Sequence, residues 1–273
     1  FTGDEISYNT AVGYEAGMRL STGITNVIVG SLAGDHLTTG NENIAIGYQA
    51  LTAEDGDGRN VAIGHNTLRD QNAGADAYNV AIGFGAGENV TTGVNNTIIG
   101  GQAGDAMTEG QNNTLVGKGA GTDLTTGESN VAIGVSALGS EDTGHDNTAI
   151  GYQALTALNY NGSGYNTAVG RRSGYGVSTG LGNTLLGASA GYVLTTGSYN
   201  VAVGKNALSS EDENSYNVAV GVNALNSLDA GADAYNVAVG YNTGVAVTTG
   251  IYNTLVGSNA GDSLTTGGYN VAI

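Results

Sequence analysis

Asn79-Val80-Ala81-Ile82-Gly83 is the stretch that decides the fold, because close relatives of it recur from one end of the chain to the other. Each copy has Asn, a β-branched residue, a small or apolar residue and an aliphatic residue, and Gly follows wherever the chain continues. Successive copies begin 17 or 19 residues apart. A short fixed period of this kind predicts a solenoid, in which each coil contacts mainly its neighbours. The Asn residues stand at 9, 26, 43, 60, 79, 96, 113, 130, 147, 166, 183, 200, 217, 236, 253 and 270.

We number each coil from this Asn as position 1. Position 2 is always Thr, Val or Ile, and position 4 is always Val, Ile or Leu. This alternation predicts a short strand whose positions 2 and 4 share one face, which we expect to be the core face. The Gly at position 5 predicts a corner where a positive φ or a close backbone approach excludes a side chain. The Asn is expected to stack as an amide ladder that bridges the coils.

The second half of the coil comes in two versions. Gly-type coils have Ala-Gly or a close relative at positions 8 and 9, an aliphatic residue or Met at position 12, and then Thr-Thr-Gly or a variant, as in Ala33 to Gly40. Leu-type coils have Leu at position 9 and an acidic loop, as in Ala50 to Gly58. We expect the large side chain at position 9 or 12 to fill the core opposite positions 2 and 4.

The order of the two coil types repeats along the chain and predicts super-repeats 9–78, 79–165, 166–235 and 236–273. We expect residues 1–273 to form a single all-β domain, a parallel β-solenoid of about sixteen 17–19-residue coils. Phe1 to Tyr8 resembles the end of a coil, and Val271 to Ile273 resembles the start of a strand. Both ends therefore predict a segment of a longer fibre.

Position 3 is Ala, Ile or Leu in every coil and is never polar. If positions 2 and 4 face the core, position 3 faces outward and forms an unbroken apolar stripe. Such a stripe is more typical of an interface than of a solvent surface. We therefore expect a homo-oligomer packed along the stripe of Ala81, Ala132 and Leu185. The alternative, that both faces of the strand are enclosed within one chain, stays open.

The composition excludes several classes of partner. A net charge of −17 with only seven Lys and Arg residues argues against nucleic acid or an anionic membrane surface. No apolar run approaches the roughly 18 residues that would span a bilayer, so we expect no membrane insertion by this segment. The absence of Cys excludes disulfides and thiolate metal sites. Collagen is excluded because the 48 Gly do not recur every third residue and Pro is absent.

The run Tyr-Asn-Val-Ala-Ile/Val-Gly at 78–83 and 235–240, with Ala at position 8 in the first of them (Ala86), resembles the head repeats of YadA-like trimeric autotransporter adhesins. Asn147 to Leu155 is similar to repeats of phage-type tail-fibre proteins. The resemblance covers essentially the whole chain, although the coils of the adhesin heads are shorter. It implies a left-handed β-roll in a homotrimeric rod, located outside the cell, on the cell surface or on a virion.

No catalytic constellation is evident. His36, His65 and His145 occupy three different coil positions, so they do not predict a metal row. Gly83 to Gly87 and Gly117 to Gly121 look like phosphate-binding loops, but their glycines belong to the repeat and no helix follows. We therefore expect no enzyme, and no catalytic, cofactor-binding or metal-binding residues.

The acidic loops leave one alternative open, the binding of Ca²⁺. They carry the hard oxygen ligands that Ca²⁺ prefers, although a solvated charge run is the simpler interpretation. These loops are Glu54-Asp55-Gly56-Asp57, Glu141-Asp142 and Glu211-Asp212-Glu213.

The predicted function is a structural and adhesive surface fibre, the rod or head of a trimeric adhesin or viral tail fibre. Its loops would present binding surfaces to a glycan or protein receptor. Tyr at the last coil position offers faces for sugars, or else packs over the Asn ladder. The alternatives are a self-assembling extracellular filament that stacks end to end, and an ice-binding solenoid that uses the Thr-Thr pairs. The last-position tyrosines are Tyr8, Tyr78, Tyr165, Tyr199, Tyr216, Tyr235, Tyr252 and Tyr269.

Overall fold

The computed structural model describes residues 7–56, 58–210 and 212–273, and this part of the chain contains no helix. One strand per coil joins a parallel sheet, and within each unit successive strands along the chain pair with one another, as β5 does with β6 and β12 with β13. The predicted parallel β-solenoid is therefore confirmed. The strands are β1 (Thr10–Val12), β2 (Val27–Val29), β3 (Ile44–Ile46), β4 (Val61–Ile63), β5 (Val80–Ile82), β6 (Thr97–Ile99), β7 (Thr114–Val116), β8 (Val131–Ile133), β9 (Thr148–Ile150), β10 (Thr167–Val169), β11 (Thr184–Leu186), β12 (Val201–Val203), β13 (Val218–Val220), β14 (Val237–Val239), β15 (Thr254–Val256) and β16 (Val271–Ala272).

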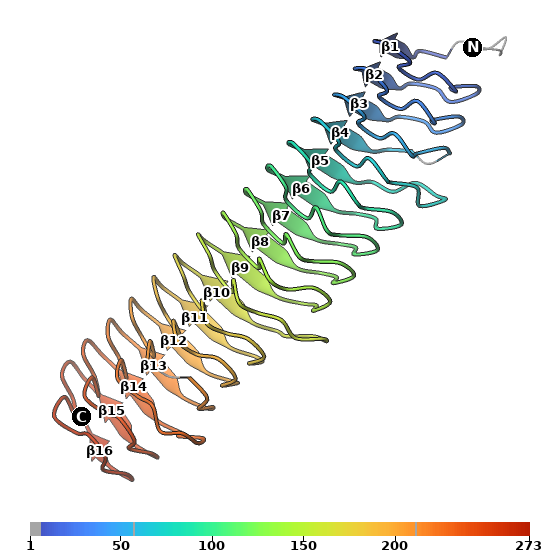
Figure 1. Cartoon of the computed structure of the whole chain (residues 1–273). Helices are drawn as coiled ribbons and strands as arrows, with labels where there is room; N and C mark the ends of the chain where they lie inside the picture. The colour runs from blue at the N-terminus through green and yellow to red at the C-terminus, as the bar shows by residue number, and fades with distance from the viewer. Residues whose placement is uncertain (1–6, 57, 211) are drawn as a thin grey trace. The chain divides into compact units, whose positions relative to one another are not determined.

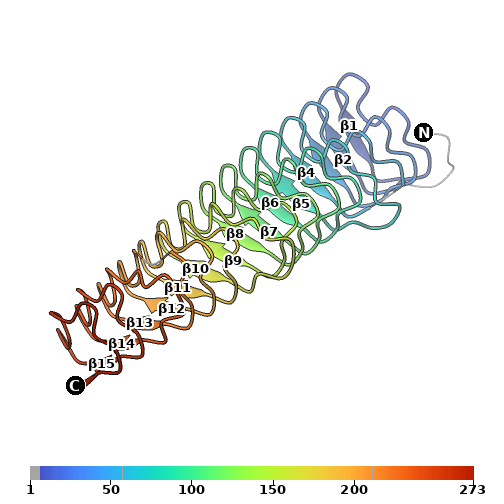
Figure 2. The same cartoon turned by 60° about the horizontal axis from the view of Figure 1, so that its bottom comes forward.

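The chain divides into two compact units, Phe1–Ala132 and Ile133–Ile273. In each unit the strands lie side by side along one side of the coils, and loops form the rest of each coil (Figures 1 and 2). The register is constant, because equivalent coil positions pair with one another: Ala62 lies opposite Ala81, and Ala202 lies opposite Ala219. The two additional residues of a 19-residue coil therefore leave the strand pairing unchanged.

The core face of the strand is the opposite of the predicted one. Position 3 points inward: Ala81, Ile98 and Leu115 are each 0% exposed. Positions 2 and 4 point outward and are half-buried or exposed. Alternation establishes which residues share a face but not which face is inside. A coil of this size encloses a narrow interior, which the single column of position-3 side chains fills from the strand side.

The prediction of one large buried side chain at position 9 or 12 is confirmed, but this side chain lies opposite position 3. Leu37 at position 12 of a Gly-type coil and Leu51 at position 9 of a Leu-type coil are both 0% exposed. Position 9 is left-handed in both types, with φ of 50° at Gly34 and 54° at Leu51. The left-handed backbone conformation of a Leu residue costs about 1–2 kcal/mol of free energy. Burying its side chain contributes about 1.5–3 kcal/mol and offsets that cost.

The Gly at position 5 has two reasons to be Gly. Gly100 has a φ of 139°, which L side chains rarely adopt, and a Cβ built on it would lie 2.4 Å from the carbonyl oxygen of Gly117 in the next coil. The backbones of successive coils therefore approach too closely at this corner for any side chain. The predicted corner is confirmed.

The predicted Asn ladder is also confirmed. The backbone N–H of Asn96 donates to Oδ1 of Asn79 at 2.9 Å, and its side-chain Nδ2 donates to the carbonyl of Gly110 at 2.8 Å. Both Asn side chains are buried. Each amide thus joins its coil to the preceding one and also closes its own coil, which satisfies polar groups that water cannot reach.

Candidate functional site

The outward face of the strands is a largely apolar surface that runs along each unit. It consists of the columns at positions 2 and 4, which contain Thr, Val, Ile and Leu and no charged residue. Val27, Ile82 and Val239 are 37%, 36% and 38% exposed. Seven steps of about 4.8 Å and three residues of about 3.3 Å give each unit a face of roughly 35 by 10 Å. We call these two columns the outward sheet face.

Aromatic residues follow the strand at position 6 and extend this apolar surface. Tyr48, His65 and Phe84 stack in three consecutive coils, with ring centroids 5.0 and 5.1 Å apart. Tyr48 is 44% exposed and Phe84 is 60% exposed. His65 thus lies between two aromatic rings and is itself exposed.

The predicted contact stripe is wrong as a surface. Ala81, Ala132 and Leu185 are each 0% exposed within a single chain, so no second chain can contact them. The physical reason is the inverted strand, which turns position 3 into the core. The alternative considered above, that one chain encloses position 3, is the correct one for this column.

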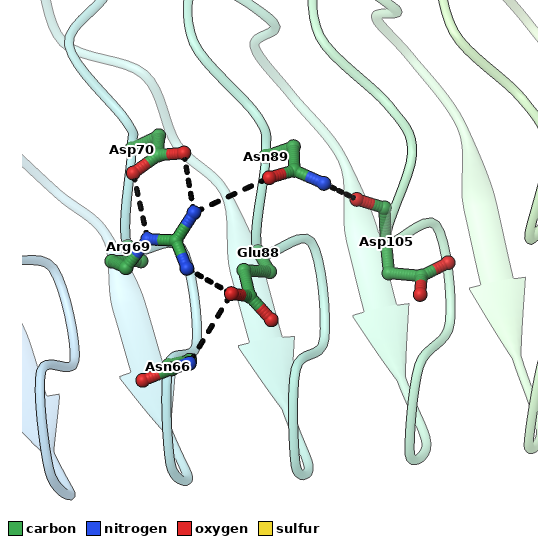
Figure 3. Close-up of polar contacts among 6 residues, drawn as sticks. All are labelled: Asn66, Arg69, Asp70, Glu88, Asn89 and Asp105. Carbon is green, nitrogen blue, oxygen red and sulfur yellow. Dashed lines mark hydrogen bonds and ion pairs between the residues drawn. The ribbon is translucent and has the colours of Figure 1, made fainter.

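A polar cluster centred on Arg69 joins the loops of three consecutive coils (Figure 3). The Arg69 guanidinium donates to both carboxylate oxygens of Asp70 at 2.8 Å and also pairs with Glu88. Nδ2 of Asn89 donates to the backbone carbonyl of Asp105 at 2.6 Å. The hydrogen bonds that Arg69 donates to Asp70 and Glu88, together with the charges of these carboxylates, raise the pKa of Arg69 against the opposing effect of burial.

One carboxylate of this cluster has fewer hydrogen bonds than the Arg69 guanidinium. One carboxylate oxygen of Asp105 is buried without a hydrogen bond, and burial, followed by the charges of Asp123 and Glu88, raises the pKa of Asp105. The cluster fixes loops to one another and contains no nucleophile next to a general base. The cluster was not predicted from the sequence, although the sequence contains a signal for it: Arg69, Glu88 and Asp105 all occupy position 10 of consecutive coils.

The acidic loops are not uniformly solvated. Glu54 and Glu141 occupy position 12, the core position of Gly-type coils, and both are 0% exposed. Glu141 accepts hydrogen bonds from the backbone N–H groups of Gly144 at 2.7 Å and Tyr160 at 3.4 Å, and burial raises its pKa. Asp55 is exposed, whereas Asp57 and Glu211 lie outside the described residues. Within the described residues no group of three or more His, Asp or Glu side chains is arranged to hold a metal ion.

The Thr-Thr pairs use their first hydroxyl internally. The Thr91 hydroxyl donates to the carbonyl of Thr108 at 3.1 Å, and Thr195 donates to Asp212 at 2.8 Å. In these two pairs only the second Thr, Thr92 or Thr196, is exposed, whereas Thr248 and Thr265, the first members of the last two pairs, are exposed as well. These hydroxyls therefore join the turns of successive coils by hydrogen bonds. The pairs do not present two rows of free hydroxyls, which weighs against ice binding through them.

The fold and these surfaces define the chain as a β-solenoid repeat protein. Comparison of the chain with protein-family models, with curated protein sequences and with solved structures gives no match. No helix in the described ranges has the length and hydropathy needed to cross a bilayer.

Proposed function

We propose that this chain is a structural and adhesive fibre segment that associates with copies of itself through the outward sheet face. The observation that supports this most strongly is the pair of uncharged apolar columns at positions 2 and 4, which run through consecutive coils. Exposed apolar surfaces of several hundred Å² are typical of interaction sites. Charged residues are also depleted at the centres of protein interfaces.

A second copy of the chain is the partner that fits this surface best. The net charge of −17 comes from residues outside these columns, so the face itself offers no charge complementarity, and its only polar side chains are the Thr residues at position 2. Because the columns follow the stacking direction of the coils, a rotational symmetry axis parallel to that direction brings the same columns of all copies together. The resemblance to YadA-like head repeats favours three copies.

The assembly would leave the loops on its outside. The loops of the Leu-type coils would then face a glycan or protein receptor, outside the cell, on the cell surface or on a virion. The alternative of a self-assembling filament uses the same coils, but it places the contacts between the ends of chains.

The experiment is a sedimentation comparison of two single substitutions in the coil of β14. Val239→Asp adds a charge to the outward sheet face, where Val239 is 38% exposed. Thr249→Asp adds the same charge to an exposed turn residue of the same coil. We expect Val239→Asp to reduce the mass to that of the monomer and Thr249→Asp to leave the oligomer intact. Equal masses for the two variants would refute the proposed interface.

A further inference from the structure

Five tyrosines in the second unit form a continuous column of stacked rings. They occupy the last position of five consecutive coils. Neighbouring ring centroids are 5.0 to 5.6 Å apart, and neighbouring ring planes differ by 4° to 11°. All five have left-handed φ values of 52° to 63°, so the same backbone conformation directs each ring the same way. The tyrosines of this column are Tyr199, Tyr216, Tyr235, Tyr252 and Tyr269.

Stacking leaves the edges of the rings exposed and covers their faces. Tyr235, in the middle of the column, is 42% exposed although it has a ring on each side. Tyr199 is the first ring of the column. A Cβ on Gly182, in the preceding coil, would lie 2.8 Å from this ring, so the ring packs over the Gly182 backbone. Sugar stacking needs a free ring face, which the inner rings lack. The column instead presents a row of accessible phenol edges.

We propose that this tyrosine column is a site of oxidative cross-linking, in which neighbouring phenols are coupled by a one-electron oxidant such as a haem peroxidase acting with hydrogen peroxide. Each of two neighbouring tyrosines gives up one electron and its phenolic proton and becomes a phenoxyl radical. The two radicals form a carbon–carbon bond between ring carbons ortho to the oxygens. The hydrogen on each of these carbons moves to the phenolic oxygen, which restores both aromatic rings. The two electrons and two protons reduce one hydrogen peroxide to two water molecules through the peroxidase.

The geometry favours coupling within one chain over coupling between chains. Two rings stacked in one chain are held next to each other and react with a high effective concentration. The exposed ring edges give the oxidant access and leave room for the rings to turn toward each other. Each link would join consecutive coils and close a loop of 17 or 19 residues, which restricts the unfolded chain as other cross-links do.

The arrangement of the rings also determines how many dityrosine links each chain can form. Four neighbouring pairs lie along five rings, and at most two of these pairs can couple at once, since each ring then has one partner. Tyr175 and Tyr192 form a separate stacked pair, with centroids 5.2 Å apart and planes 12° apart. Complete coupling of these stacked pairs therefore gives three links per chain, two of them in the column.

The test oxidises the dilute full chain with peroxidase and hydrogen peroxide and measures dityrosine fluorescence, chain mass and cross-linked peptides. The double variant Tyr216→Phe, Tyr252→Phe breaks all four pairs of the column while it keeps stacked rings in place, because Phe has no phenol to couple. The control is Tyr14→Phe, Tyr241→Phe, which removes two exposed tyrosines that belong to none of these stacked pairs. Thermal unfolding of both variants confirms that they fold.

We expect the wild-type chain to lose two hydrogen atoms per link at the mass of one chain and to yield peptides that join consecutive column tyrosines. The column variant should retain about one third of the fluorescence, from Tyr175 and Tyr192, and the control should retain nearly all of it. Equal fluorescence from the two variants would overturn the proposal. Links found only between chains would overturn it as well.

Discussion

Asn79 holds Asn96 through two contacts: its Oδ1 accepts the Asn96 backbone N–H at 2.9 Å and the Asn96 side-chain Nδ2 at 3.2 Å. Asn96 repeats the arrangement, since its own Oδ1 accepts the backbone N–H of Asn113 at 3.0 Å. The same side chain is thus a donor to one coil and an acceptor from the next. The coils are joined by this buried polar column as well as by strand pairing.

Asn96→Ala removes one rung of this column. It leaves the buried N–H of Asn113 and the carbonyl of Gly110 without the partners that Asn96 supplied. Each unsatisfied buried group costs about 1–3 kcal/mol, so we expect the two groups together to lower the free energy of unfolding by about 2–6 kcal/mol. Urea unfolding measures it, with Asn72→Ala as the control because Asn72 is an exposed Asn of the same unit. A loss no larger than that of the control would show that the ladder does not stabilise the stack.

Two neighbouring glycines offer a matched test of the corner. Gly100→Ala forces a Cβ to within 2.4 Å of the Gly117 carbonyl oxygen at a φ of 139°, so we expect a loss of more than about 3 kcal/mol. Gly101→Ala meets nothing closer than 4.0 Å and should be neutral or stabilise the fold by up to about 1 kcal/mol. Thermal unfolding of the two variants provides the comparison. Similar melting temperatures would contradict the close approach of the coils.

The two coil types predict a compensating pair of substitutions. In the coil of β7, Leu115 is large at position 3 and Gly121 is small at position 9; a Cβ on Gly121 would lie 2.9 Å from a Leu115 methyl group. The coil of β9 has the reverse arrangement, with Ala149 and Leu155, and it also keeps an aliphatic residue at position 12. Leu115→Ala alone should cost about 2–5 kcal/mol by leaving a cavity, and Gly121→Leu alone should cost about 1–3 kcal/mol by overpacking.

The double variant of Leu115→Ala and Gly121→Leu reproduces the arrangement at β9. We expect its loss in the free energy of unfolding to be smaller than the sum of the single losses by about 0.5–3 kcal/mol, since the two sites share one space. Chemical unfolding of the four proteins measures this difference. Simple additivity would indicate that positions 3 and 9 do not fill a common volume.

Much of this architecture could be predicted from the chain, because repetition makes each coil evidence for the others. The strand at positions 2 to 4, the Gly corner and the Asn ladder all followed from residues that hardly vary. The inner face of the strand did not follow. Val80 and Ile82 look like core residues by hydropathy, and Ala81 does not; but the interior is narrow, and the β-branched side chains suit the pleated outer surface.

The surface features were harder to predict for a different reason. The Arg69 cluster includes Glu88 and Asp105, which follow Arg69 by 19 and 36 residues in the sequence. These residues become neighbours only when the coils are aligned by position. The same is true of the tyrosine column. Its members were recognised from their common coil position, but their stacking on one another depends on a left-handed backbone that sequence alternation does not reveal.

Glu141 predicts a pH dependence. Burial raises its pKa in the folded chain, so the protonated carboxyl is the form that the fold favours. Its contribution to stability is therefore present at low pH and is lost as the pH rises through the raised pKa. We expect Glu141→Gln to raise the melting temperature at neutral pH, because it removes the buried charge and keeps an acceptor for the N–H of Gly144. The advantage should shrink toward roughly pH 4, the ordinary range of a Glu carboxyl.

Melting temperatures of both proteins across this range measure the effect. Exposed carboxylates titrate equally in wild type and variant, so the difference between them isolates Glu141. An advantage for Glu141→Gln that is largest in acid and vanishes at neutral pH would have the opposite sign and would contradict a buried, destabilising charge.

The measurement that tests the central claim most directly is the sedimentation-equilibrium mass of the wild-type chain beside that of Val239→Asp. Self-association through the outward sheet face predicts a trimer for the wild type, three times 27.1 kDa, and a monomer for the variant. The variant should keep its β-sheet circular dichroism, because the substitution lies outside the core. A wild-type chain that sediments at 27.1 kDa over the whole concentration range would contradict the account.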